Sequence, residues 1–292
     1  MRRFKEAAIE KTLMASAMVT ILVTIGIIMV LSVEAFNFFS VVPIVDFLTD
    51  TQWTPLFTEK HFGILPLLSG TLLTSFIAIA FAVPIGLSIS IYISEYAPKS
   101  FRKTIKPALE LLAAVPTVVY GFFALTVVTP FLQTFIPGLS GFNSLSAGLV
   151  MGIMIIPFIS SLSEDALHAV PNSLREGSYG MGATRLQNVF RVLIPAASSG
   201  IIVSIILAIS RAIGETMIVA IAAGQQPRLT LDPTVPVETI TAYIVQVSLG
   251  DVGHGTLEYQ TIFAAGITLF LFTFILNTIS YRLRKKFAEK YE

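Results

Sequence analysis

Uncharged stretches long enough to cross a membrane recur along the chain. A bilayer core of about 30 Å needs roughly 20 apolar residues in a helix. Thr12–Val33 carries no charged residue over 22 positions, and Phe62–Ser94 carries none over 33. The uncharged stretch Leu111–Ser163 covers 53 positions, which is too long for one crossing. Prolines and glycines near its middle divide it, so we expect two spans near 107–130 and 144–163.

Two more apolar stretches complete the set. The stretch from Val192 to about Ala223 is interrupted by Arg211 and Glu215, and Tyr259–Tyr281 is uncharged. Six helices in total predict an all-α membrane protein. The first helix follows a basic N-terminal segment, but its apolar run is longer than that of a signal peptide and ends at no convincing cleavage site. We therefore expect an uncleaved anchor.

Basic residues are concentrated in alternate connecting segments. With the N-terminus inside, the cytoplasmic segments hold sixteen Lys and Arg residues, and the outer loops hold two, Lys60 and Arg228. Positive residues favour the cytoplasmic side, so we expect both termini there. The predicted divisions are an N-terminal helix with the first outer loop (1–66), a membrane core with a cytoplasmic loop at 164–195 (67–282), and a basic tail (283–292).

The composition agrees with a membrane protein and excludes several other classes. Apolar residues make up 54% of the chain and charged residues 13%, against about 25% charged in soluble domains. The formal net charge of +1 gives no indication of a nucleic-acid partner. There is no cysteine, and His61, His168 and His254 are far apart in sequence. We expect no disulfide, no metal and no other cofactor.

The chain also lacks the sequence features of a transport motor. It contains no GxxxxGK[ST] phosphate loop, so it cannot bind ATP by that route. It has no dense relay of intramembrane carboxylates, which a proton-driven pump would need. We therefore expect no enzymatic activity, and any uphill transport must draw its energy from a partner.

The loop between the fourth and fifth spans has a distinctive pattern. Ser173 and Glu176 have the spacing of a capping box, which predicts a short helix ending near Gly180 or Gly182. A second short helix is expected at about 183–191. The pattern alone leaves open a helical hairpin that only lies on the membrane surface.

This loop resembles that of the permease subunits of bacterial ABC importers, which carry the pattern E-A-A-x3-G-x9-I-x-L-P. Here Glu176, Gly177 and Ser178 are followed after three residues by Gly182, and after nine more by Val192–Pro195, which reads V-L-I-P. Every spacing matches, and the departures are small-for-small or aliphatic exchanges.

The resemblance implies a type I ABC importer permease core for 67–282, whose loop forms coupling helices that seat on a separate ATPase. The small residues would permit close approach of another backbone, and the glycine would allow a tight turn. The residues expected to serve this coupling are Leu174, Glu176, Gly177, Ser178, Tyr179, Gly182 and Ala183.

Two charges lie within the fifth span. If the helix continues through them, Arg211 and Glu215 share one face at i and i+4. A charge at the bilayer centre costs about 2.5–3.5 kcal/mol on insertion scales, so both should face protein or water. One interpretation is a salt bridge that only fixes helix packing. The other is a substrate pathway in which Arg211 receives an oxyanion, with Glu215 holding the guanidinium and Ser210 and Thr216 adding hydroxyls.

The stretch Arg211–Thr216, and Leu112–Gly121 in the third span, resemble the phosphate-importer branch of the family. Within that branch, the basic N-terminus, the short 131–143 loop and Glu215-Thr216-Met217 are more similar to the subunit called PstC than to its companion PstA. The resemblance implies inorganic phosphate as cargo. It also implies a PstA-like companion permease, an ABC ATPase dimer and an extracytoplasmic phosphate-binding protein.

Other functions remain open from the sequence. The cargo could be another oxyanion such as sulfate or molybdate. A stand-alone channel or ion-driven carrier would transport without an ATPase, and a non-transporting scaffold or phosphate sensor would not need Arg211. Elsewhere, Glu110 is expected to pair with Lys106, and Trp53 to act as an interface anchor or a binding-protein contact. The 224–258 loop is expected to dock a soluble partner.

Overall fold

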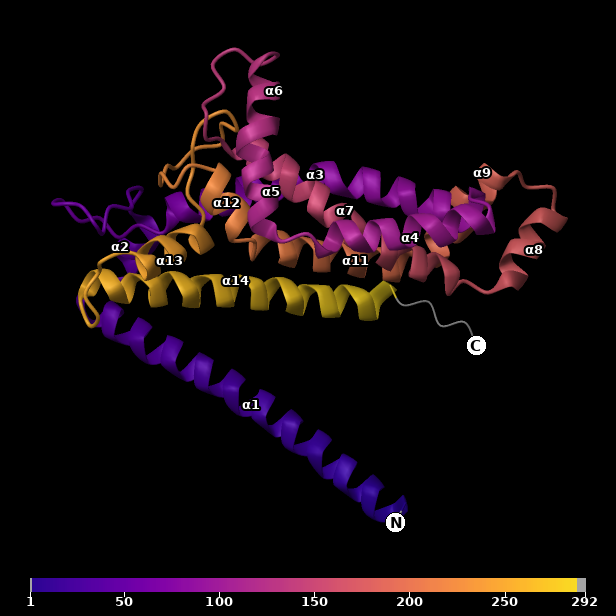
Figure 1. Ribbon diagram of the computed structural model, residues 1–292, viewed down its shortest axis with the longest axis horizontal. Coiled ribbons are helices and arrows are strands. Elements are labelled where there is room, and N and C mark those ends of the chain that lie inside the picture. Colours follow the sequence, from indigo (N-terminus) through magenta and orange to yellow (C-terminus); the bar gives the residue numbers. More distant parts are fainter. Residues whose placement is uncertain (1, 288–292) are drawn as a thin grey trace.

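The computed structural model describes residues 2–287 and is built almost entirely of helices (Figure 1). Within this range the extended pairings are two isolated bridges, Trp53–Phe62 and Gly224–Val237. Four of its helices are long and apolar enough to cross a membrane alone. They are α1 (Arg2–Val41), α3 (Leu65–Ile91), α7 (Ser144–His168) and α14 (Leu257–Phe287).

Two further crossings are bent. α4 (Lys99–Ala114) meets the segment Thr117–Gln133 at 86°, and Arg185–Ala196 meets α11 (Ser198–Ile213) at 72°. Among the described residues, the expected six spans are reached only when each bent pair is counted as one. The last five residues of the predicted basic tail lie outside the described residues.

The span expected near 107–130 is present as a bent pair of helices. α4 ends at Ala114, and both Val115 and Pro116 adopt extended backbone, with ψ of 131° and 136°. A proline disfavours helical backbone in the residue before it and supplies no amide donor. Pro116 therefore ends one helix and starts the next, and the chain turns sharply between them.

Shorter elements continue or connect these helices. The π-helical turns are η1 (Tyr92–Tyr96), η2 (Ala124–Val128) and η3 (Val189–Leu193). The short α-helices are α2 (Ile44–Thr49), α5 (Thr117–Phe123), α6 (Thr129–Gln133), α8 (Asn172–Gly180), α9 (Arg185–Asn188), α10 (Ile194–Ala196), α12 (Met217–Ala222) and α13 (Ile240–Leu249).

The centre of the bundle is the long packing of α3 against α7. Glycines on both helices permit the close approach: a Cβ on Gly148 would lie 2.7 Å from Ile77, and one on Gly86 would lie 2.9 Å from Ile159. Small residues are the usual means by which membrane helices bring their backbones together. α5, α11 and α12 add buried apolar side chains to this core. This core therefore positions α7, at whose C-terminal end the 164–195 loop begins.

α1 stands apart from the bundle and meets it mainly along α14 (Figure 1). None of its most apolar 18-residue window is buried within the chain. A helix that is apolar on all sides suits lipid or another membrane subunit as its neighbour.

A second core lies at the end of the bundle opposite α8 and α9 (Figure 1). Phe38 of α1, Phe47 of α2 and Trp53 pack edge to face in succession onto Tyr243 of α13. This aromatic cluster holds the loop at 50–64 against α13 and α14.

Candidate functional site

The expected coupling segment does fold as two short helices. α8 is followed by Met181 and then by Gly182, which has a φ of +83° and turns the chain toward α9. Only a glycine adopts this left-handed backbone without strain. Asn188 Nδ2 donates to the Tyr179 hydroxyl at 3.3 Å, which joins the second helical segment to the first.

The expected capping box at Ser173 and Glu176 is wrong. α8 begins at Asn172 directly after Pro171, so Ser173 lies inside the helix and makes no capping bond. A capping box is present one helix later, where the Thr184 hydroxyl accepts from the Gln187 amide (3.3 Å) and the Gln187 side chain accepts from the Thr184 amide (2.9 Å). Pro171 occupies the N-cap position of α8, and its side chain has no oxygen that could accept from a helix amide.

The motif residues themselves are largely exposed. Glu176 and Gly177 lie on the surface, and Ser178 is buried against the bundle. The same segment carries five exposed apolar side chains that we together call the coupling face: Leu174, Tyr179, Met181, Leu186 and Phe190. Met181, which the sequence did not single out, is 87% exposed. Apolar side chains gathered outside the predicted spans indicate a protein partner.

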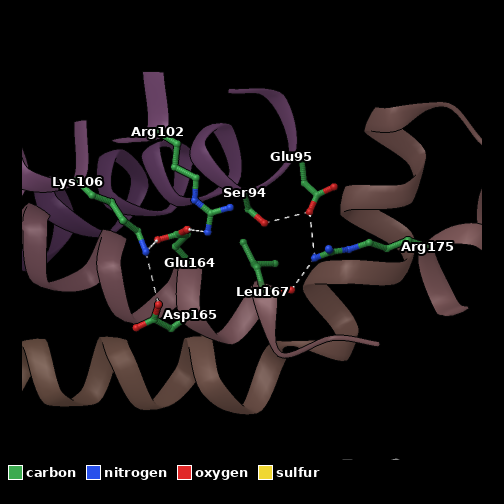
Figure 2. A network of polar contacts seen from close by, with 8 residues as sticks. All are labelled: Ser94, Glu95, Arg102, Lys106, Glu164, Asp165, Leu167 and Arg175. Carbon is green, nitrogen blue, oxygen red and sulfur yellow. Dashed lines mark hydrogen bonds and ion pairs between the residues drawn. The ribbon is translucent and has the colours of Figure 1, made fainter. Parts of the chain in front are cut away.

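Two ion-pair clusters lie where this segment leaves the bundle, and the second one bonds the segment itself (Figure 2). In the first, Glu164 near the end of α7 is 1% exposed and receives Arg102 and Lys106 from α4, with Lys106 Nζ 2.5 Å from Oε2. Lys106 also lies 3.8 Å from Asp165. The expected pairing of Lys106 with Glu110 is therefore wrong, because the packing of α4 on α7 offers Lys106 a buried carboxylate.

In the second cluster, Arg175 of α8 reaches back toward the bundle (Figure 2). Its Nη2 lies 2.7 Å from the Leu167 carbonyl oxygen of α7 and 3.2 Å from Glu95 Oε1 of η1. The Ser94 hydroxyl donates to the same carboxylate oxygen at 3.0 Å. α8 is thus joined through one guanidinium to the ends of both central helices.

Sequence reasoning missed Arg175, Glu95 and Glu164 as a group. A signal was present: Glu95 and Glu164 are the first charged residues after the two longest uncharged stretches. Carboxylates at such positions mark where a span leaves the membrane and where a cation can meet it.

The expected geometry of the intramembrane charges is wrong. α11 ends at Ile213 with Gly214 as its C-cap, so Arg211 and Glu215 do not share a helix face. No ion pair joins them in the described chain. Glu215 Oε1 instead accepts from the amides of Met217 (3.1 Å) and Ile218 (3.3 Å), which caps the N-terminus of α12.

Glu215 lies in a buried polar layer rather than in an open path. It is 9% exposed, and its carbonyl oxygen accepts from the Thr241 hydroxyl at 2.6 Å. Thr241 and Thr239 lie 3.0 Å apart, and the Ile240 amide donates to the Thr71 hydroxyl of α3 at 3.1 Å. These bonds join α3, the α11–α12 break and the start of α13.

Arg211 is exposed on the surface of this chain, and no carboxylate of the described residues lies within ion-pair distance of it. The neighbouring Ser210 hydroxyl donates to the Ile206 carbonyl and to Asn277 Oδ1 of α14, each at 3.1 Å. The Thr216 hydroxyl donates to the Gly214 carbonyl at 3.3 Å. The structure therefore separates the four predicted pathway residues: Arg211 faces outward, and Glu215 faces inward.

A family model described as the binding-protein-dependent transport system inner membrane component matches residues 82–289. These residues include the coupling segment, both ion-pair clusters and Arg211. The chain belongs to this family. The predicted multi-pass inner-membrane location and the all-α importer permease fold are confirmed. The side on which the termini lie stays a prediction.

Full-length relatives of this family resemble the chain over most of its length. A Bacillus subtilis protein named "Probable ABC transporter permease protein YqgH" is 33% identical over 96% of this chain and 93% of its own. The "Phosphate transport system permease protein PstC" of Mesorhizobium japonicum is 38% identical over 80% of this chain and 76% of its own. The Haemophilus influenzae protein of the same name is 35% identical over 80% of this chain and 79% of its own.

Solved structures of ABC transporters share the fold. A bacterial ABC transporter for import of the acidic polysaccharide alginate superimposes with a TM-score of 0.66 over 99% of this chain and all of that chain, at 18% identity. The methionine transporter MetNI in an inward-facing form gives a TM-score of 0.61 over 77% of this chain and 96% of its own, also at 18% identity.

Proposed function

We propose that this chain is the permease subunit of an ATP-driven phosphate importer and forms half of its transmembrane pathway. The observation that carries the proposal is the similarity, across about four fifths of the chain, to relatives named as phosphate transport permeases. The chain itself has no ATP-binding loop, so a separate ABC ATPase dimer supplies the energy.

The coupling face supports this division of labour. It presents apolar side chains at the end of the bundle where positive residues are dense, the side predicted to be cytoplasmic. Movement of α8 passes through Arg175 to η1 and α7, because one guanidinium bonds both. Closure of the ATPase therefore reaches the central helix pair directly.

The exposure of Arg211 supports a pathway shared with a second permease subunit. A guanidinium facing lipid is costly, so its neighbours in the membrane must be polar. A companion of PstA type across this surface would enclose it in a polar path, and phosphate oxygens could then bond it bidentately. Glu215 serves there as a buried cap that fixes the break between α11 and α12, with Ser210 and Thr216 beside it.

Uptake of labelled phosphate in cells that lack their own importer tests the proposal. Expression of this chain with its companion permease, ATPase and extracytoplasmic phosphate-binding protein should restore phosphate uptake and leave sulfate and molybdate uptake unchanged. Restored sulfate or molybdate uptake instead would assign another oxyanion. Transport by the purified chain alone would contradict the need for an ATPase.

A further inference from the structure

A cavity of about 270 Å³ opens at the end of the bundle opposite the coupling face. Its walls are apolar side chains of the 53–57 loop together with Pro227, and its polar edges come from glutamines 225, 226 and 246. Trp53, Tyr243 and Glu238 form its buried side, each 2% exposed. The proposed transport function uses none of these groups.

Glu238 is the unusual member of this cavity. Its Oε1 is buried without a hydrogen-bond partner in the described chain, and its side chain lines the cavity. Burial raises the pKa of Glu238 to about 8, so the carboxyl group is neutral at pH 7. A protonated carboxyl group both donates and accepts hydrogen bonds. A buried polar group without a partner costs free energy that a ligand can recover.

Trp53 adds an unused donor. Its Nε1 lies against the Tyr243 hydroxyl, which bonds Thr261 at 2.6 Å, but it makes no hydrogen bond of normal geometry in the described chain. Gln226 Oε1 accepts from Arg228 at 2.9 Å, so the Gln226 amide N–H groups remain available. No Lys, Arg, His or Asp lines the cavity.

The available groups define the ligand. None of the described residues that line the cavity is cationic, so the cavity does not compensate the charge of an anion. The neutral carboxyl group of Glu238 likewise does not compensate the charge of a cation. An amide is complementary to a protonated carboxyl group: its carbonyl oxygen accepts from the Glu238 O–H, and its N–H donates to the other oxygen of the same group. Trp53 and Gln226 offer further N–H donors to the amide carbonyl. The apolar walls suit an aliphatic or aromatic body attached to that amide.

We propose that this cavity binds neutral amides that carry an apolar side chain, with Glu238 and Trp53 as the groups that hold the amide. This site goes beyond the proposed transport of phosphate and does not depend on it. The same chemistry is offered by small capped amino acids and by peptide segments of an extracytoplasmic protein.

The single tryptophan makes the site directly observable. Trp53 is the only tryptophan of the chain, so its emission reports on this cavity alone. Titrating the full-length chain in detergent micelles, which contain no other tryptophan, with N-acetyl-leucinamide should give a saturable change in emission. N-acetyl-leucine carries a charged carboxylate and should bind at least about tenfold more weakly, because the cavity has no cation to compensate a buried anion. Inorganic phosphate should give no change.

Two variants separate Glu238 from the shape of the cavity. Glu238→Gln keeps size and neutral hydrogen bonding and should bind the amide equally at about pH 6 and about pH 9.5, whereas the natural chain should lose binding at the higher pH as Glu238 ionises. Glu238→Leu should lose binding at both pH values. Glu238 and Tyr243 are the titratable groups lining the cavity, and a tyrosine with a raised pKa stays neutral at both.

The outcomes are decisive in either direction. An unsaturable response, equal affinity for the charged compound, or pH-independent binding by the natural chain would overturn the proposal. Phosphate uptake is measured independently of amide binding, so failure of the cavity proposal is distinguishable from failure of the proposed function. A capped tripeptide that binds more tightly than the single residue would identify a peptide segment as the source, and equal affinity would identify a small amide.

Discussion

Two charged residues four positions apart, Arg211 and Glu215, lie in different environments. Glu215 makes two bonds to backbone amides and is held in place by the turn around Gly214. Arg211, four positions earlier, has no carboxylate partner in the described chain and is exposed. The two residues thus have different roles although their spacing suggested a pair.

Replacing Arg211 should abolish uptake without affecting insertion. Arg211→Ala removes the cation from the proposed pathway, and Arg211→Lys should retain part of the activity, because a lysine is cationic but not bidentate. Uptake of labelled phosphate by cells with equal amounts of assembled complex measures the effect. Arg228→Ala, in an outer loop, is the matched control. Normal uptake by Arg211→Ala would exclude a pathway role.

The protonation of Glu238 should be visible in stability as well as in binding. Its folded pKa of about 8 lies above that of an unfolded glutamate, so the folded state holds the proton more tightly. The contribution of Glu238 to stability is therefore greatest below about pH 4.3 and is lost as pH rises through 8. The melting temperature of the natural chain should drop between about pH 6 and pH 9, and Glu238→Gln should reduce that drop. An equal drop in both would mean that Glu238 is ionised when buried.

At the scale of elements, the short helices could be predicted because turns and helix ends depend on residues that are neighbours in the sequence. The two coupling helices were predicted from the loop pattern around Gly182, and the structure contains both, although the capping box expected at Ser173 and Glu176 is absent from α8. The bend at Pro116 was not predicted, because prolines also occur inside continuous helices, as Pro84 does in α3. Whether a proline kinks or breaks a helix depends on packing, and a single sequence does not contain that information.

Gly182 is the turn on which the coupling helices depend. Its φ of +83° strains any β-branched side chain, although a Cβ there would meet nothing within 4 Å. Gly182→Val should uncouple ATP hydrolysis from uptake while the complex still assembles. Gly177→Ala is the control, since that helical glycine also has open space around it. Paired ATPase and uptake assays on reconstituted complexes test this, and coupled transport by Gly182→Val would contradict it.

Arg175 is predicted to be the positioning residue that links α8 to the bundle. Arg175→Met keeps a long side chain but loses the bonds to Leu167 and Glu95. Uptake per ATP hydrolysed should fall severalfold, since a buried charge-assisted bond contributes about 1.5–3 kcal/mol. Arg185→Met, on an exposed position of α9, should leave the ratio unchanged. An unchanged ratio in Arg175→Met would show that α8 is held by other contacts.

At the scale of the whole molecule, the two ends of the bundle carry different surfaces. α8 and α9, which carry the coupling face, lie at one end, and α13, which contributes Tyr243 and Gln246 to the amide cavity, lies at the other (Figure 1). Composition and uncharged stretches predicted the membrane fold, and the loop motif predicted the family. The ion pair of Lys106 with Glu164 could not be predicted, because the residues are 58 positions apart in sequence and meet only after α4 packs on α7.

The absence of cysteine makes the partner surfaces directly testable. Met181→Cys places a single thiol on the coupling face, at a position that is 87% exposed. It should cross-link to the ATPase subunit in assembled complexes. Leu249→Cys, 82% exposed at the other end of the bundle, should not. Cross-linking from Leu249 but not from Met181 would reverse the assignment of the two ends.

The outward-facing Arg211 has a consequence for the lifetime of the protein. Under the proposed pathway, a newly inserted copy that has not met its companion would carry an uncompensated cation into lipid. Such a copy is less stable in the bilayer than an assembled one and offers membrane proteases a way to distinguish the two. We expect cells making this chain in excess over its companion to degrade the surplus, so that assembly itself sets the amount of permease that persists.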